Sequence, residues 1–126
     1  AYATVVAAAA QQESSKVVVL AKSSLADAMT ARLAGKLKAG LAANVIELPD
    51  LSNGVRVKSS IYTGKAFAYN DLKADVKILA IKKNTITPEE IDATATVEMF
   101  TPALNDGDFI INVKKTEKAT GDVLLP

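Results

Sequence analysis

The chain has 126 residues, about the size of one ordinary domain, and 49% of them are hydrophobic, mainly Ala, Val, Leu and Ile, so an aliphatic core is expected. Fifteen basic and fourteen acidic side chains are interspersed and give a formal net charge of +1, which argues against nucleic acid or anionic lipid as a partner. The absence of Cys and His excludes disulfides, thiolate nucleophiles and the commonest metal ligands and general bases.

The N-terminal segment is rich in alanine. Tyr2 to Gln12 is predicted to form a helix, and the polar residues that follow predict a turn. No basic region precedes the apolar stretch, so a signal peptide is not expected, and no apolar run reaches the ~20 residues that cross a bilayer. Because the chain begins at Ala1 inside an apparent helix, without Met, we expect a fragment whose upstream part is missing.

A short β-branched run follows. Lys16 to Ala21, bounded by turn signals, predicts a strand buried on both faces of a parallel sheet. If upstream strands are missing, this strand would lie at an exposed edge and could pair with another copy of the chain. The isolated chain is then expected to be marginally stable or to self-associate.

The next segment has the period of a helix. Four apolar residues lie four apart and share one face: Leu25, Met29, Leu33 and Leu37. Ser24 is the expected cap, Asp27 the carboxylate of a capping box, and Gly40 the C-terminal stop. Ala42 to Leu48 then predicts a strand, so helix, strand, helix and strand form an open α/β unit with a right-handed crossover.

The middle third predicts an antiparallel meander. Residues 55–62 alternate as in a half-buried strand, Thr63-Gly64-Lys65 allows a turn, and Ala66 to Asn70 continues as a strand. Val76 to Lys82 is expected to add a further strand to this meander.

The last third predicts two more strands. After a break at Pro88, residues 93–99 and 109–113 alternate apolar and polar side chains, and the turn signal at residues 105–108 lies between them, so they are expected to pair. No other predicted element is available for Val123-Leu124-Leu125 to pack against. The expected class is α/β, an open parallel sheet with flanking helices and an antiparallel portion, with residues 1–126 forming part of one domain.

Candidate chemistry is sparse. Ser23-Ser24 follows a buried strand and opens a helix, so its amides could bind an anion or an adenine nucleotide phosphate, although capping already explains both serines. Gly64-Lys65 is followed by Ala66 and lacks upstream glycines, which favours a turn over a phosphate loop.

Other charged pairs are expected to be solvated. Glu89 and Glu90 are adjacent and therefore diverge, which favours an exposed first turn over an acid–base pair. Lys82-Lys83 and Lys114-Lys115 are expected at strand ends, and Tyr62 and Tyr69 as amphipathic wall residues. We assign no catalytic, cofactor-binding or metal-ligating residue.

Two stretches resemble the alpha subunit of electron transfer flavoproteins. Residues 31–41, Ala-Arg-Leu-Ala-Gly-Lys-Leu-Lys-Ala-Gly-Leu, resemble the family's helix after a buried strand, and Tyr62-Thr63-Gly64-Lys65-Ala66 resembles its Tyr, small residue, Gly, Lys or Asn, Ala motif. The chain departs from the family at Ser59-Ser60 and Lys82-Lys83, where the family carries Arg-Pro. The family's second domain opens on a glycine-arginine-glycine loop, which would begin shortly beyond Leu125-Pro126.

The resemblance implies an adenine nucleotide alpha hydrolase-like fold and a heterodimer with a beta subunit. Such heterodimers carry electrons from dehydrogenases to an acceptor through FAD, in the bacterial cytoplasm or the mitochondrial matrix. FAD is held mainly by the second domain of the alpha subunit, so no flavin contact is carried onto a residue of this chain. The segment would then be a structural scaffold that packs against the beta subunit, an electron-carrier part rather than an enzyme.

Two alternatives stay open at this point. One is a small adenine nucleotide-binding enzyme or stress-type protein that uses the start of the helix at Ser23-Ser24. The other is an interaction module without a cofactor, built on the antiparallel strands.

Overall fold

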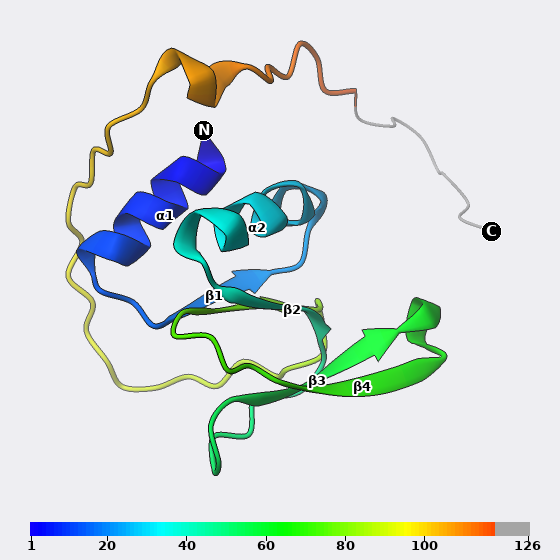
Figure 1. Ribbon diagram of the computed structural model, residues 1–126. Helices are drawn as coiled ribbons and strands as arrows, with labels where there is room; N and C mark the ends of the chain where they lie inside the picture. The colour runs from blue at the N-terminus through cyan, green and yellow to red at the C-terminus, as the bar shows by residue number, and fades with distance from the viewer. Residues whose placement is uncertain (118–126) are drawn as a thin grey trace.

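A computed structural model describes residues 1–117 and shows one mixed sheet with two helices (Figure 1). The helices and strands are α1 Tyr2–Gln12, β1 Val17–Ala21, α2 Ser24–Leu37, β2 Gly40–Val45, β3 Arg56–Ile61, β4 Ala66–Asp71 and β5 Lys77–Ile81. Two short 3-10 helices are η1 Tyr62–Gly64 and η2 Asp106–Phe109. The expected α/β class is confirmed.

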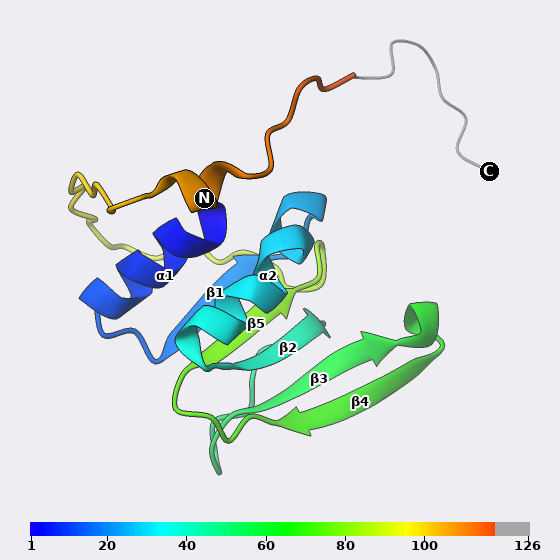
Figure 2. The same cartoon turned by 45° about the horizontal axis from the view of Figure 1, so that its top comes forward.

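The sheet has the order β1-β5-β2-β3-β4, and both helices lie on the same face of it (Figure 2). β1 and β2 each pair parallel with β5, whereas β2 with β3 and β3 with β4 pair antiparallel. The expectation that β5 extends the antiparallel meander is therefore wrong. Ile78, Leu79 and Ala80 are all at least 98% buried, and such a continuous apolar strand is stable only where both faces and both edges are covered.

The first core lies between the helices and the sheet. Its buried members are Ala3 and Ala7 of α1, Leu33 of α2 and Ile78 of β5, with Val18 and Leu20 packed against them. Alanine on the inner face of α1 lets that helix approach α2 closely. The alanine-rich start of the chain therefore forms the helix that was expected and buries its smallest side chains.

The second core lies on the face of the sheet without helices. Ala42, Val45, Val57 and Leu79 are buried there, against partly buried Val55, Leu72 and Ile81. β1 contributes little to this core, since Val17 and Val19 are 45% and 56% exposed. The prediction that this strand is buried on both faces is wrong, and among the described residues it lies at one end of the sheet.

The α2 helix forms where its period predicts, with a different cap. The Ser23 hydroxyl, not that of Ser24, accepts a hydrogen bond from the Ala26 amide at 3.1 Å. Asp27 pairs with Lys22 at 2.6 Å, so no capping box with Asp27 forms. Leu25 is 53% exposed because the buried face of the helix is formed by Ala26, Thr30 and Leu33 instead.

The end of α2 lies earlier than expected. The helix ends at Leu37, its C-cap Lys38 has a left-handed φ of 51°, and Gly40 is already the first residue of β2. The Gly40 amide donates to the Val76 carbonyl at 2.9 Å, which starts the strand two residues before the predicted Ala42. β2 ends at Val45 because the chain there turns toward β3.

The β3–β4 hairpin agrees with the prediction. Its strands pair from Arg56 with Asp71 to Ile61 with Ala66, and the turn lies at residues 62–65. The hairpin projects beyond the helices at the end of the sheet opposite β1 (Figure 1).

Residues 84–113, which we name the arm, do not form the expected hairpin. No strand lies between Asn84 and the last described residue, Glu117, and η2 occupies the expected turn. The arm instead runs round the outside of the body and reaches the N-terminal end of α1, where the Thr4 hydroxyl donates to the Asp108 carboxylate (Figure 1). An alternating sequence gives a strand one apolar face, but a strand also needs a neighbouring strand to which its backbone can hydrogen-bond. No strand lies beside the described residues of the arm. Val123 to Pro126 lie outside the described residues.

Candidate functional site

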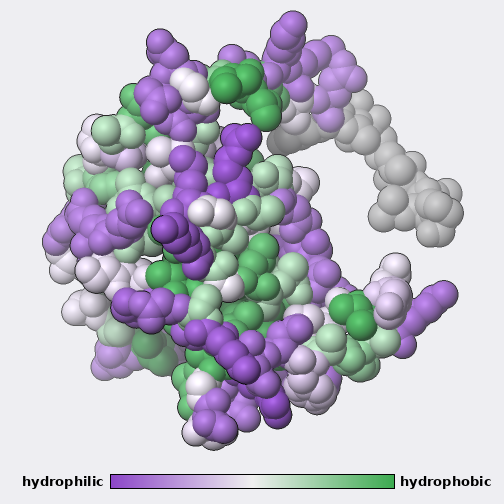
Figure 3. All heavy atoms as spheres, viewed as in Figure 1, coloured by the Kyte–Doolittle hydropathy of each residue, from purple (hydrophilic) through white to green (hydrophobic). Residues whose placement is uncertain are grey.

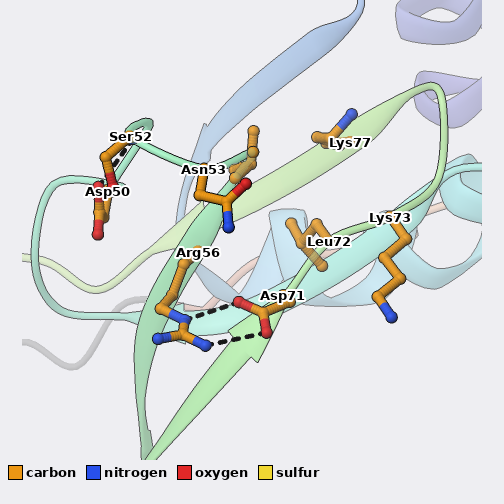
Figure 4. Close-up of a pocket in the computed structure, with 10 residues that line it drawn as sticks. Asp50, Ser52, Asn53, Arg56, Asp71, Leu72, Lys73 and Lys77 are labelled. Carbon is orange, nitrogen blue, oxygen red and sulfur yellow. Dashed lines mark hydrogen bonds and ion pairs between the residues drawn. The ribbon is translucent and has the colours of Figure 1, made fainter.

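One cleft lies between the 50–55 loop and the end of β4 (Figure 4). It measures about 710 Å³, and four of its five charged side chains already make hydrogen bonds, while Lys73 makes none with the described residues. Arg56 donates to both Asp71 oxygens, at 2.7 and 3.1 Å, and this hydrogen bonding lowers the pKa of Asp71 below its ordinary value. The Ser52 amide donates to Asp50 at 2.9 Å and lowers the pKa of that carboxyl in the same way.

The position of this cleft also argues against a ligand. Lys77, the first residue of β5, lines it and donates to the carbonyls of Ala74 and Asp75 at 2.7 and 3.3 Å. The cleft therefore lies at the amino end of the parallel strands, whereas open α/β sheets bind ligands beyond the carboxyl ends. We assign it a structural role in holding the β3–β4 hairpin.

A smaller cleft lies beyond the carboxyl ends of β1 and β5. This carboxyl-edge cleft measures about 320 Å³ and is lined by Lys22, Ser23, Ser24, Asp27, Lys82 and Lys83. Backbone hydrogen bonds hold the three strand ends together: the Lys22 amide donates to Ile81 at 2.7 Å, and the Lys82 amide donates to Val45 at 2.8 Å. The cleft is thus built on rigid elements.

The electrostatics of the carboxyl-edge cleft favour an anion. Asp27 neutralises Lys22, whereas neither Lys82 nor Lys83 takes part in an ion pair with the described residues. Two positive charges therefore remain near the N-terminus of α2, which carries the positive end of the helix dipole. The Ser23 hydroxyl is already occupied by its capping bond.

A third cleft adjoins the second across Lys82. It measures about 200 Å³ and is lined by Asn44, Ser60, Ile61, the hairpin turn and Lys82. Three successive turn residues have left-handed φ: Tyr62 at 49°, Thr63 at 57° and Gly64 at 87°. Left-handed backbone is costly for β-branched Thr63, and such strain is typical of turns whose shape matters for function.

Comparison with known families decides the relationship. A family model for the electron transfer flavoprotein domain matches residues 1–106. The chain belongs to the electron transfer flavoprotein family. A search of curated proteins gives no significant match.

The two stretches that resemble this family fall on defined elements. Residues 31–41 cover the second half of α2 and the start of β2, and Tyr62 to Ala66 forms the hairpin turn. Gly64 has a positive φ of 87°, so the glycine of the motif is explained by backbone geometry. In this member of the electron transfer flavoprotein family the motif is a turn, as its sequence predicts.

The structure brings together two pairs of residues that the sequence treats separately. Ser23-Ser24 and Lys82-Lys83 line the same cleft, because β1 and β5 are parallel neighbours that end together. Sequence reasoning missed this because it placed β5 in the antiparallel portion. The available signal was that both pairs directly follow short apolar runs, and parallel strands of that kind end at one edge of the sheet.

The remaining candidates are dispersed. Glu89 and Glu90 are exposed, and no helix begins at them among the residues described. Lys115 pairs with Glu117 in extended chain rather than at a strand end. Tyr62 and Tyr69 are 76% and 65% exposed.

Among the described residues there is neither a metal-ligand cluster nor a membrane-spanning helix. Residues 1–117 contain no cluster of three potential metal ligands among Asp, Glu, His and Cys, and no helix among them is long and apolar enough to span a bilayer. The carboxyl-edge cleft does not suit a flavin, since its loop after β1, Lys22-Ser23, has no glycine to let backbone approach a pyrophosphate. We therefore derive no flavin chemistry from these residues.

Proposed function

We propose that this chain is part of the N-terminal domain of an electron transfer flavoprotein alpha subunit and serves there as a scaffold for subunit packing. The family match over residues 1–106 carries the proposal. The alpha assignment is supported by the resemblance of residues 31–41 and 62–66 to alpha subunits. In this proposal FAD is held by another domain of the parent protein, and dehydrogenases supply its electrons, in the bacterial cytoplasm or the mitochondrial matrix.

The projecting hairpin is the surface that we assign to the beta subunit. Phe67 and Tyr69 lie on the same face of β4, are 57% and 65% exposed, and flank the Lys58 ammonium group at 5.1 and 5.9 Å from their ring centres. Exposed aromatic side chains on a rigid strand are typical of interface cores. The Lys58–Glu47 ion pair holds the cation over these rings.

The proposal is tested by expressing the parent gene together with a beta subunit gene and recording the visible spectrum of the purified complex. A flavin spectrum is expected. A colourless product, or no complex, would contradict the proposal. The chain described here, carrying an affinity tag, is expected to retain the beta subunit on a column.

A matched pair of variants locates the interface. Phe67→Ala with Tyr69→Ala is expected to weaken retention of the beta subunit strongly, because both side chains lose their contact area. Tyr2→Ala removes an equally exposed aromatic side chain, 62% exposed, from α1 and should leave retention unchanged. An equal loss of beta-subunit retention in both variants would show that the hairpin is not part of the interface.

The convergence of lysines at the carboxyl-edge cleft supports a second candidate function, binding of an adenine nucleotide. Calorimetric titration with AMP and ATP tests it directly. If the cleft binds a phosphate, Lys82→Ala with Lys83→Ala should abolish binding, because it removes both unpaired charges. Lys114→Ala with Lys115→Ala is the matched control, since it removes two lysines far along the chain. Absence of heat with either nucleotide would exclude this candidate.

A further inference from the structure

The third cleft, which we name the turn cleft, lies in the body of the molecule, the name we give to residues 1–83. Every residue that lines it comes from β2, β3, the hairpin turn or the residue after β5. The hairpin stands out from the rest of the molecule in the space-filling view, and Tyr62 at its turn is 76% exposed (Figure 3). The cleft is therefore built on the sheet and open to a small ligand.

Lys82 supplies the charge of the turn cleft, and its backbone is fixed. Its amide donates to the Val45 carbonyl at 2.8 Å, and its carbonyl accepts from the Thr85 hydroxyl at 2.7 Å. Val45 pairs in turn with Ser59, so Lys82 starts beside the end of β3. The Lys82 ammonium group makes no ion pair within residues 1–117, and none of the described residues that line the cleft is acidic. One uncompensated positive charge is thus held at this site.

Ser60 adds a hydroxyl that no described protein group satisfies. The residue is 8% exposed and lines the cleft, yet its hydroxyl makes no hydrogen bond within residues 1–117. A Cβ on Gly64 would lie 3.7 Å from the Ser60 oxygen. This glycine, with a φ of 87°, therefore leaves space beside the hydroxyl. A polar group buried to this degree normally has a partner, and the open space is where one can bind.

A bulge in β2 brings a third donor to the cleft. The register of β2 with β5 shifts between Ala42 and Val45, and Asn44 within this bulge has a left-handed φ of 54°. Bulges re-aim single side chains and are frequent beside binding sites. The Asn44 side chain lines the cleft and makes no hydrogen bond with the described part of the chain. Three donors from separate elements therefore line one small cleft.

We propose that the turn cleft binds a phosphate group, which accepts hydrogen bonds from Ser60 and Asn44 and pairs with the ammonium group of Lys82. A phosphate group carries several strong acceptor oxygens that point apart, which suits donors arriving from separate strands. Lysine binds phosphate as a point charge, without the planar fork with which arginine recognises carboxylates. The volume of about 200 Å³ suits so small a group, since clefts for drug-sized ligands measure about 300–1,000 Å³.

Two departures from the electron transfer flavoprotein motifs meet at this site. Ser59-Ser60 and Lys82-Lys83 stand where the family carries Arg-Pro, and one residue of each pair lines the turn cleft. A proline at position 60 would have no hydroxyl to offer. The site is therefore a property of this chain, and the inference goes beyond the proposed scaffold role without depending on it.

Titration of the isotope-labelled 126-residue chain with inorganic phosphate, followed by NMR at constant ionic strength, tests the site. We expect saturable shifts of the backbone amides of residues 60–64 and 82. Acetate should bind about tenfold more weakly, because it has a smaller charge and only two oxygens. Absence of saturable shifts, shifts confined to residues 23–27 at the start of α2, or equally tight binding of acetate would each overturn the proposal.

Matched variants locate the contacts. Ser60→Ala and Lys82→Gln should each weaken phosphate binding about tenfold, since each removes an interaction with a charged ligand. Ser59→Ala removes the neighbouring buried hydroxyl on the opposite face of β3, and Lys65→Gln removes a charge beside the turn that does not line the cleft. Both controls should change the affinity by less than about twofold. The same spectra show that each variant is folded, and unchanged affinity in folded Ser60→Ala would overturn the proposal.

Titration with AMP identifies the source of the phosphate group. Affinity equal to that of inorganic phosphate would mean that the phosphate group alone is bound. Tighter binding with additional shifts at residues 22–27 would mean that a nucleotide spans the turn cleft and the carboxyl-edge cleft, which share Lys82. In either case Ser60→Ala should weaken AMP binding about tenfold. None of these measurements uses the beta subunit, so their failure would leave the proposed scaffold role untouched.

Discussion

The body and the arm contain similar alternating patterns and have different structures. In β3, Val57 and Ser59 are 1% and 3% exposed because β2 and β4 flank that strand. In the arm, Val97 and Met99 alternate with polar residues in the same way and remain exposed. The comparison shows that alternation specifies which side chains can share a face, while the presence of a neighbouring edge decides whether a strand forms. Stability should therefore reside in the body.

The largest difference between body and arm is expected for truncation of apolar side chains. Leu33→Ala should lower the free energy of unfolding by about 3 kcal/mol, because Leu33 of α2 is fully buried against α1 and β5. Met99→Ala in the arm should change it by less than about 0.5 kcal/mol. Urea unfolding followed by circular dichroism, at a concentration low enough to keep the protein monomeric, measures both. Similar losses in the two variants would contradict the assignment of stability to the body.

A smaller effect is expected at the start of α2. Ser23→Ala should cost about 1 kcal/mol, because it removes the hydroxyl that accepts from the Ala26 amide. Ser24→Ala should cost less, since no hydrogen bond of its side chain caps the helix. Thermal unfolding of the two variants checks this. A greater loss of stability in Ser24→Ala would show that Ser24 is the cap, as the sequence predicted.

One body variant should increase stability. Ser59 is 3% exposed, and its hydroxyl has no hydrogen-bond partner among the described residues. Ser59→Ala should therefore raise the free energy of unfolding by about 1 kcal/mol, since it removes a desolvated polar group. Ser60→Ala, on the opposite face, is the control and should change it by less than about 0.5 kcal/mol. Destabilisation by Ser59→Ala would reveal a partner for this hydroxyl.

The smallest effect concerns pH. Hydrogen bonding from Arg56 lowers the pKa of Asp71 in the body, and hydrogen bonding from Thr4 lowers the pKa of Asp108 in the arm. A carboxyl with a lower pKa in the folded state stabilises the protein above its unfolded pKa of ~3.9, and this contribution is lost as the pH falls toward the folded pKa. Asp71→Asn should flatten the acid limb of stability against pH. An unchanged acid limb would show that this exposed pair contributes nothing measurable.

Much of the fold could be predicted from local pattern. The helical period of α2, the alanine-rich α1 and the turn at Gly64 each act over a few residues, and each element lies close to its predicted position. The place of β5 could not be predicted in this way, because parallel pairing with β1 and β2 depends on residues at least 36 positions away. The carboxyl-edge cleft was missed for the same reason, since Lys82 and Ser23 meet only once those strands are adjacent.

The arm shows the opposite error. Its two alternating segments and the intervening turn signal predicted a hairpin, yet residues 106–109 form η2, with Asn105 and Asp108 in a reciprocal capping box. The turn residues form their hydrogen bonds with one another. The two flanking segments are therefore not brought close together, as a hairpin requires.

Hydrogen exchange of backbone amides tests the difference between body and arm most directly. In dilute protein, amides of β5 should exchange only through global unfolding, whereas amides of residues 93–99 should exchange almost as fast as in an unstructured chain. Strong protection of the arm in dilute monomer would contradict the account, because it would mean that these residues already form strands within their own copy.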